Sequence, residues 1–384
     1  MRHEGRTVLV SGMIAAVPNL GGATWAVLQY LLGLERLGLH VFFVESLPQN
    51  AALPAGAPLC ATENARYLQD VMRDFGLQDR SALLLEGSDE TVGLAMDDVR
   101  DIARRADLLL NLSGLLERDD LTAHIPVRVY LDMDPAFTQL WYSVQGIDMR
   151  FGDHTHFVTV GEAVGTPRCT VPTSGMDWIT SRPPVVLERW PAVNTPGSAF
   201  TTIANWRGYG SIDYQGVFYG QKAHSLRPLM GLPERTGRPF VLALSIHPGE
   251  TGDLRALDTN GWKLVDPAQV SDSPDSYRRF VQESRAEFGI AKSGYIASRC
   301  GWFSDRSTCY LASGRPVIAQ ETGFSDFIPV GEGLFAFGTA DDVANAIEAI
   351  ENDYDLHRRA ARRIAEAFFD SDQVLARLLD RVLA

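Results

Sequence analysis

The feature that most constrains the fold of this chain is a regular alternation of short β-rich runs with helical stretches. Residues 7–10 form a β-rich run, a glycine-bearing loop follows, and residues 24–37 have the composition of an apolar helix. Gly38 ends that helix, and residues 41–45 are again β-rich. A strand, a helix and a second strand in this order form a βαβ unit, which predicts a parallel sheet.

The same alternation continues through two successive regions. In the first region we predict helices at 64–75 and 97–105, and strands at 82–85, 107–112, 127–131 and 157–160. In the second region we predict strands at 201–204, 241–245, 262–265, 288–291, 294–298 and 316–319, and helices at 308–313, 341–350 and 374–382. The pattern indicates an α/β protein with two Rossmann-like, doubly wound domains, whose ligands bind at the carboxyl ends of the strands.

A proline-rich passage separates the two regions. Six prolines fall between positions 167 and 196, and because proline breaks helices this passage is expected to be extended. We predict an N-terminal domain over 1–190, a C-terminal domain over 191–355 and a terminal helical segment over 356–384. A chain of 384 residues is long enough for two domains with separate cores and a cleft between them.

Composition excludes several classes of protein. The formal net charge of −13, with no basic stripe to offset it, argues against a nucleic-acid partner. No run of about eighteen apolar residues is present and the first residues lack a signal-peptide pattern, so we expect a cytoplasmic protein without a transmembrane segment. The four cysteines lack the spacing of a zinc site or a disulfide framework. Oligomeric state is left open.

The most distinctive stretch of the second region is a strand, a turn and a helix around positions 299–313. Ser304 is a favourable N-cap and Asp305 suits the first turn of a helix, so a helix is expected to begin here. The N-terminus of a helix presents free N–H groups and can bind an anion. Read only as structure, the Gly-Trp and Gly-Arg-Pro sequences in this stretch are ordinary turn signals.

Residues 300–304, with the sequence CGWFS, and 311–317, with the sequence LASGRPV, resemble the donor-binding signature of nucleotide-sugar glycosyltransferases of the GT-B fold. In the plant enzymes of that family the signature reads HCGWNS, then a helix, then L-A-x-G-x-P-V. Two positions differ, since Arg299 stands where those enzymes have a phosphate-binding His, and Phe303 stands where they have Asn.

This resemblance implies two Rossmann-like domains with a cleft between them and a terminal helix that crosses back onto the first domain. It implies a nucleotide diphosphate sugar as the donor substrate, bound by the C-terminal domain, and an acceptor bound by the N-terminal domain. We expect no metal and no other cofactor, because a helix dipole and cationic side chains can stabilise the leaving diphosphate.

The resemblance also implies which residues bind the donor. They are the residues at the signature, Arg299, Gly301, Ser304, Asp305 and Arg306, together with Glu321, whose carboxylate would accept hydrogen bonds from sugar hydroxyls. Arg207 and Lys222 loosely resemble an Arg and a Lys that retaining members place on the diphosphate, and His247 ends a strand where it could touch the nucleotide. A solvated surface cation is the alternative for Arg207 and Lys222, and an exposed loop acid is the alternative for Glu321.

The catalytic base is sought on the acceptor side. The loop at 11–24 contains no His, Asp or Glu, whereas plant-type members place a His there. Asp132 and Asp134 follow a predicted strand, and we predict that they are catalytic, with loop-capping carboxylates as the alternative. His154 and His156 are weaker candidates. Position 329 is Pro, so the E-x7-E pattern of many retaining members is absent and the anomeric outcome stays open.

Other reaction classes lack their motifs. No GxGxxG follows the first strand, and neither GxxxxGK[ST] nor GxSxG occurs, which disfavours a nicotinamide-dependent oxidoreductase, a P-loop enzyme and a serine hydrolase. We predict a metal-independent glycosyltransferase that transfers a hexose from a nucleotide diphosphate sugar to a small-molecule or glycan acceptor. The alternatives are an epimerase of the same fold and a non-catalytic nucleotide-sugar-binding protein.

Overall fold

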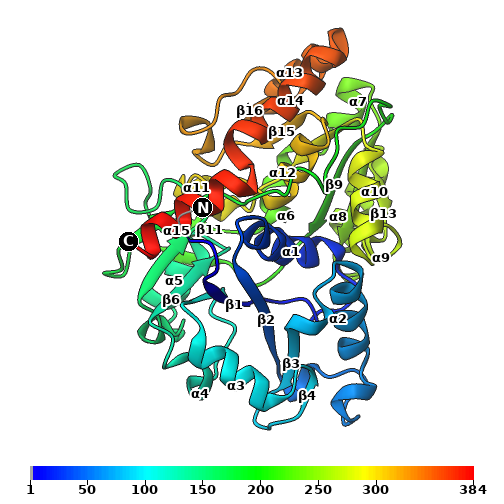
Figure 1. Cartoon of the computed structure of the whole chain (residues 1–384). Helices are drawn as coiled ribbons and strands as arrows, with labels where there is room; N and C mark the ends of the chain where they lie inside the picture. Colours follow the sequence, from blue (N-terminus) through cyan, green and yellow to red (C-terminus); the bar gives the residue numbers. More distant parts are fainter. Residues whose placement is uncertain (1–2) are drawn as a thin grey trace.

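The computed structural model describes residues 3–384 and shows an α/β protein built on two separate sheets (Figure 1). Residues 1 and 2, which the predicted first domain includes, lie outside the described residues. The first sheet has eight strands in the order β4-β3-β2-β1-β5-β6-β7-β8, and all neighbours are parallel except β3 and β4. Its strands are β1 (Thr7–Ser11), β2 (His40–Leu47), β3 (Ser81–Leu85), β4 (Thr91–Gly93), β5 (Leu108–Leu112), β6 (Val127–Asp132), β7 (His156–Thr159) and β8 (Trp178–Thr180).

The second sheet has six parallel strands in the order β13-β12-β9-β14-β15-β16. They are β9 (Phe200–Asn205), β12 (Phe240–Ser245), β13 (Lys263–Val265), β14 (Ala286–Gly289), β15 (Val317–Gln320) and β16 (Leu334–Phe337). A separate antiparallel hairpin is formed by β10 (Ile212–Tyr214) and β11 (Val217–Tyr219). The predicted pair of mainly parallel sheets is therefore confirmed.

Helices connect the strands in both halves. The helices among the strands of the first sheet are α1 (Gly21–Arg36), α2 (Glu63–Asp74), α3 (Met96–Arg105), α4 (Asp119–Thr122) and α5 (Phe137–Ser143). Those of the second sheet are α6 (Lys222–Leu226), α7 (Leu232–Thr236), α8 (Thr251–Thr259), α9 (Pro267–Val270), α10 (Pro274–Gln282), α11 (Ser293–Ser298) and α12 (Asp305–Ala312). The chain ends with α13 (Ala340–Asn352), α14 (Tyr354–Ile364) and α15 (Ser371–Val382). No helix within residues 3–384 is long and apolar enough to cross a membrane.

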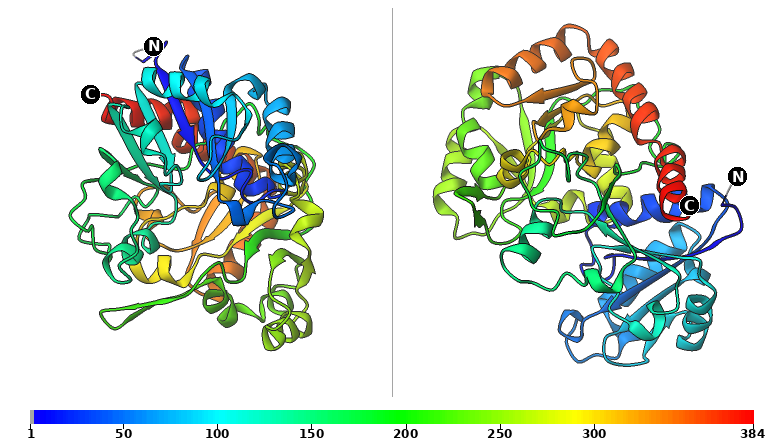
Figure 2. Two further views of the ribbon diagram at one scale, coloured as in Figure 1. Left: turned by 90° about the horizontal axis from the view of Figure 1, so that it is seen from below. Right: turned by 90° about the vertical axis from the view of Figure 1, so that its left-hand side faces the viewer.

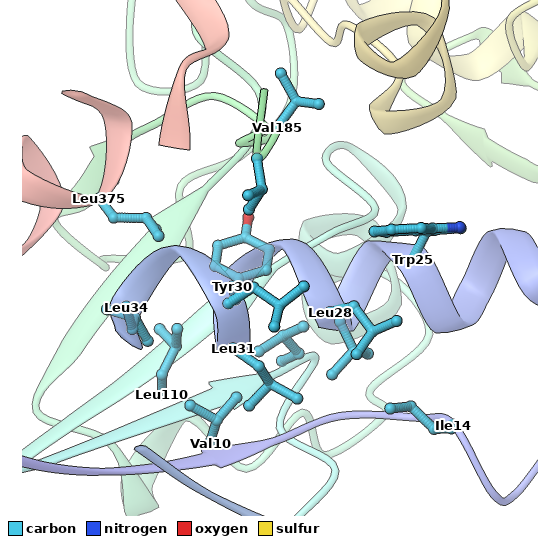
Figure 3. Packing of buried hydrophobic residues seen from close by; sticks show 14 of the residues in the cluster. Val10, Ile14, Trp25, Leu28, Tyr30, Leu31, Leu34, Leu110, Val185 and Leu375 are labelled. Carbon is cyan, nitrogen blue, oxygen red and sulfur yellow. The ribbon is translucent and has the colours of Figure 1, made fainter. Parts of the chain in front are cut away.

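Helix α1 lies at the centre of the molecule. In Figure 3 the strand residues Val10 and Leu110 lie on one side of α1, and Val185 and Leu375 lie on the other. The helix is apolar on most of its surface because it is covered on both sides, which is the pattern of a buried helix. Figure 2 shows the last helix, α15, returning to lie beside α1.

Several backbone contacts join the halves of the chain next to their facing loops. The N–H of Ala163 donates to the carbonyl of Cys300 at 3.0 Å, and Gly161 pairs with Trp302 in an isolated β-bridge. At the start of α1, the N–H of Gly21 donates to the carbonyl of Ser271 at 2.7 Å. These hydrogen bonds, together with a hydrophobic core that contains residues of both halves, join the two sheets.

One predicted element has a different structure. The sequence predicted a strand at 294–298, but these residues belong to helix α11, which ends at Arg299 with φ of 49°. This short helix packs against the first half, where a Cβ added to Gly294 would lie 2.7 Å from the ring of Phe137. Strands β4, β8 and β16 and the hairpin were not predicted.

Gly301 is expected to be essential for the contact between the halves. Its φ is +74°, and an added Cβ would lie 2.7 Å from the backbone nitrogen of Ala163. Gly216 is a matched control because its φ is +78° and nothing lies within 4 Å of its added Cβ. Gly216→Ala should lower the free energy of unfolding by about 1 kcal/mol, because alanine is strained in the left-handed backbone conformation. Gly301→Ala should lower the free energy of unfolding by about 1–3 kcal/mol more than this, because its added Cβ would crowd the backbone of Ala163.

Urea unfolding of both variants measures this difference. Equal destabilisation of the two variants would show that the approach of Gly301 to Ala163 contributes nothing beyond backbone strain.

Candidate functional site

A cleft of about 820 Å³ lies where the N-terminal end of α1 faces the carboxyl ends of β9, β12 and β13. Strand β9 is flanked by β12 on one side and by β14 on the other, so the strand order reverses at this point. Ligands of open α/β sheets bind at such a switch point. The polar residues that line the cleft are Asn205, Lys222, Ser245, Asp266, Ser271, Tyr277, Asp305 and Arg306.

Arg306 is a cation held firmly at the edge of this cleft. Its side chain is largely buried, its Nε donates to Glu287 Oε1 at 2.6 Å, and its Nη1 donates to the carbonyl of Ile203 at 3.0 Å. Ser304 caps the start of α12 by accepting a hydrogen bond from the N–H of Arg306 at 3.3 Å. The predicted helix start is therefore confirmed, and the first turn of α12 opens on the cleft through Asp305 and Arg306.

Lys222 is a second cation in the cleft, at the start of α6. Among residues 3–384, no hydrogen-bond acceptor or carboxylate contacts its half-buried ammonium group. Burial, together with the nearby positive charges of Arg306 and Lys292, lowers the pKa of Lys222 from 10.5 to about 7. An anion bound beside Lys222 would stabilise the protonated form of its side chain.

The cleft also offers carboxylates. Asp305 lies in the first turn of α12, and Asp266 caps α9 by accepting a hydrogen bond from the N–H of Ala268 at 3.0 Å. Carboxylate oxygens accept hydrogen bonds from hydroxyl groups. Cations and acceptors in one cleft suit a ligand that carries both negative charge and hydroxyls.

A polar cluster that spans the two halves is centred on Asp134, which follows β6. Its Oδ2 accepts hydrogen bonds from Lys292 Nζ at 2.7 Å and from the hydroxyl of Tyr209 at 2.6 Å. Its Oδ1 accepts a hydrogen bond from the hydroxyl of Tyr295. Lys292 also lies 4.2 Å from the ring centroid of Tyr209, a cation–π distance. The positive charge of Lys292 lowers the pKa of Lys222 and the negative charge of Asp134 raises it, so the charges of this cluster act on the cation of the cleft.

Comparisons with known proteins identify the fold. No protein-family model matches the chain, and no curated protein sequence matches it. Among solved structures, a glycosyltransferase from Rickettsia africae ESF-5 is similar over 98% of both chains, with a TM-score of 0.55 and 13% identity. Anabaena Alr3699/HepE in complex with UDP and glucose is similar over 98% of this chain and 100% of that one, with a TM-score of 0.57 and 13% identity.

A third similar structure is an alpha-glucosyltransferase in complex with UDP and a 13-mer DNA containing a HMU base. It has a TM-score of 0.61 and 11% identity, over 99% of this chain and 100% of that one. The chain has the GT-B fold. The predicted fold class is thereby confirmed at the level of the whole chain. One of these GT-B proteins was solved with DNA, so the expected absence of a nucleic-acid partner stays a prediction.

Asp132 differs from its predicted role as a catalytic group facing the cleft. The side chain is completely buried, and its carboxylate accepts hydrogen bonds from Thr138 at 2.6 Å, Gln139 at 2.8 Å and Thr159 at 2.7 Å. Burial raises the pKa of Asp132, while these hydrogen bonds lower it. Since Asp132 also accepts from the N–H of Asp134 at 2.9 Å, we assign it the positioning of that residue.

The weaker histidine candidates lie outside the cleft. His154 is buried between the side chain of Asn111, at 3.1 Å, and the carbonyl of Arg150, at 2.8 Å. Burial lowers its pKa, which is the expected effect on a cation in an apolar setting. His156 follows on β7 and contacts the hydroxyl of Thr155 at 2.9 Å.

Two predicted donor residues, Arg299 and Gly301, lie outside the cleft lining. Arg299 lies at the end of α11 with half of its side chain exposed, and its guanidinium lies 3.7 Å from Asp326 instead of in the cleft. Gly301 lies against the backbone of Ala163 in the first half. Neither residue lines the cleft, whereas Arg306 does.

Three further predicted residues also lie outside the cleft lining. Arg207 is paired with Glu250 on the surface, and His247 is exposed. Glu321 accepts a hydrogen bond from the N–H of Gly323 and so shapes its own turn. Of the predicted donor set, the cleft therefore brings together Lys222, Asp305 and Arg306, with Ser304 buried directly before them.

Sequence reasoning missed Lys292, Tyr209, Tyr295 and Glu287. Lys292 follows the carboxyl end of β14, so the same rule that selected Asp134 could have found it. No sequence pattern marks Tyr209 and Tyr295, because their hydrogen bonds to Asp134 depend on how the two halves are placed relative to each other.

The ion pair of Glu287 and Arg306 should be needed for a stable second half. Glu287 is fully buried, so Glu287→Gln leaves the Arg306 charge without a partner and should cost about 3–5 kcal/mol. The double variant Glu287→Gln with Arg306→Met should recover part of that loss, since no buried charge remains. Urea unfolding of the single and double variants measures the coupling, and additive losses would contradict it.

Proposed function

We propose that the protein is a glycosyltransferase that moves a hexose from a nucleoside diphosphate sugar to an acceptor. The observation that carries this proposal is the unpaired ammonium group of Lys222, beside Arg306 and the first turn of α12, in the cleft at the switch point. Two phosphates need cations and N–H donors placed together, and this end of the cleft supplies both. The GT-B fold and the UDP complexes of two similar structures support the same conclusion.

In this proposal the diphosphate and the hydroxyl groups of the donor bind to different residues of the cleft. Lys222, Arg306 and the N–H groups of α12 bind the diphosphate and stabilise the charge that develops on it as the sugar leaves. These cations supply the stabilisation in a metal-independent transfer. Asp266 and Asp305 accept hydrogen bonds from donor hydroxyls.

Asp134 is the acceptor-side carboxylate in this proposal. It lies on the first half, and Lys292 and the two tyrosines fix its orientation. An acceptor hydroxyl that displaces one of these donors could pass its proton to Asp134. A non-catalytic nucleotide-sugar-binding protein is the second candidate, because all three of these hydrogen bonds already occupy the carboxylate.

Lys222 should make UDP binding depend on pH. Its pKa is about 7 in the free protein, and a bound diphosphate raises that pKa toward the ordinary 10.5. Binding therefore takes up a proton above pH 7, and affinity should fall as pH rises, by roughly tenfold per pH unit between 8 and 9. UDP keeps its full charge over this range, since its phosphate pKa is about 6.

Calorimetry in two buffers with different ionisation enthalpies measures both the affinity and the proton uptake. Lys222→Arg is the matched control, because a guanidinium stays charged and should abolish the slope while preserving tight binding. A wild-type affinity that does not change with pH, or an equal slope in Lys222→Arg, would remove Lys222 from the diphosphate site.

Turnover tests the proposed function directly. UDP-glucose, incubated with the protein and a panel of acceptors, should release free UDP, and Asp134→Asn should lower that rate about 10²-fold or more. UDP affinity should stay within a few-fold, since Asp134 is placed on the acceptor side. Asp177→Asn, at an exposed position on the same half, is the control and should leave the rate unchanged.

Donor binding without any turnover in the wild type would favour the non-catalytic candidate. Unchanged turnover in Asp134→Asn would remove this carboxylate from the mechanism while leaving the donor site intact.

A further inference from the structure

Exposed apolar side chains are concentrated at one edge of the first sheet. Eight of the ten large apolar side chains that are exposed within residues 3–384 lie in segments that follow the carboxyl ends of β1, β2, β5 and β6. These eight are Met13, Val17, Leu20, Leu53, Leu115, Tyr142, Val144 and Ile147. Exposed apolar side chains gathered on one surface mark a binding site more often than scattered ones do.

Four of these side chains form what we call the apolar platform: Met13, Val17, Leu20 and Leu53. Their exposed fractions are 37%, 37%, 37% and 45%. The first three lie on the loop between β1 and α1, and Leu53 lies on the loop between β2 and α2. Leu20 also lines the donor cleft, so the platform begins where that cleft ends.

A buried carboxylate fixes the first loop from below. Glu45 is only 2% exposed, and it accepts hydrogen bonds from the N–H groups of Ile14 at 2.9 Å, Ala15 at 2.8 Å and Ala16 at 2.7 Å. Three such bonds to one carboxylate hold three successive peptide groups in a single arrangement.

A buried amide ties the second loop to the first. Asn64 is completely buried, and its side chain donates to the carbonyls of Ala15 at 2.8 Å and Ala51 at 3.2 Å. The same side chain accepts a hydrogen bond from the N–H of Leu53 at 2.8 Å. The platform therefore has a fixed shape before any ligand arrives, which lowers the entropic cost of binding.

The two loops carry no charge at all. Residues 11–24 and 48–62 contain no Asp, Glu, Lys, Arg or His, in a chain that is 22% charged. Nucleic acid is bound mainly through lysine and arginine contacts to phosphates, so these loops lack what such a partner needs. An uncharged apolar body of a small molecule matches the platform in chemistry, and Leu20 joins the platform to the cleft.

We propose that the apolar platform binds the apolar portion of the acceptor, which is an uncharged alcohol or phenol with a hydrocarbon or aromatic body. The reaction of its hydroxyl rests on the proposed function, whereas its binding does not. Transfer would form a bond between the acceptor oxygen and the sugar's anomeric carbon. The bond from that carbon to the diphosphate breaks, the diphosphate leaves with the electron pair, and the hydroxyl proton passes to Asp134.

A series of 4-alkylphenols, from methyl to butyl, is the probe, and calorimetry on the whole chain saturated with UDP is the measurement. Each added methylene that becomes buried should tighten binding about 3- to 4-fold. Val17→Asp and Leu53→Asp should each weaken binding of 4-butylphenol about tenfold or more. Val17→Ser removes less apolar surface and adds no charge, so it should weaken binding by a smaller factor.

Val330→Asp is the matched control, because Val330 is 43% exposed and lies on the second half, away from the platform. It should leave both the alkylphenol series and UDP binding unchanged. Affinities that do not change along the series, or equal losses in Val17→Asp and Val330→Asp, would overturn the proposal.

Two other occupants would also overturn it. One outcome is tight binding of a 13-mer duplex DNA that Val17→Asp abolishes, and the other is self-association in sedimentation that Val17→Asp abolishes. Alkylphenols that bind as expected to a protein with no affinity for UDP would support the platform and reject the donor site.

Discussion

The buried ion pair of Arg306 with Glu287 is the interaction on which the candidate site depends. Removing two charges from water is costly, and it is tolerated only where the geometry is good and further hydrogen bonds are made. Arg306 meets this condition through Glu287 on β14 and the carbonyl of Ile203 on β9. The pair therefore ties the first turn of α12 to two strands at the switch point, which fixes where an anion can bind. Because an arginine side chain keeps its proton, this cation persists at every working pH.

Lys222 complements this permanent cation with one that responds to its surroundings. Its pKa of about 7 results from burial next to other positive charges. In the free protein the charged form of Lys222 is destabilised. A bound anion would stabilise that charged form. The cluster centred on Asp134 contains residues of both halves, with Asp134 from the first half and Lys292, Tyr209 and Tyr295 from the second. The site thus depends on the same contacts that place the halves relative to each other.

The sequence allowed the two parallel sheets to be predicted, because the alternation of β-rich runs and helices is a local pattern. The start of α12 was predicted for the same reason, since Ser304 and Asp305 carry the capping signal in their own chemistry. The strand predicted at 294–298 is helix α11 instead, and Gly294 in that helix lies against Phe137 of the first half, a contact that no local pattern reveals. Asp132 and Asp134 looked equivalent because both end one strand, and only the buried partners of Asp132 distinguish them.

We propose that the cleft binds a nucleoside diphosphate through Lys222 and Arg306. Calorimetric titration of the whole protein with UDP and with UMP tests it most directly, since the two ligands differ only by the second phosphate. Hydrogen bonds from charged groups contribute about 1.5–3 kcal/mol each, so UDP should bind at one site and about tenfold or more tighter than UMP. Lys222→Met should remove most of that difference. Equal affinities for UDP and UMP, or no binding of either, would contradict the claim.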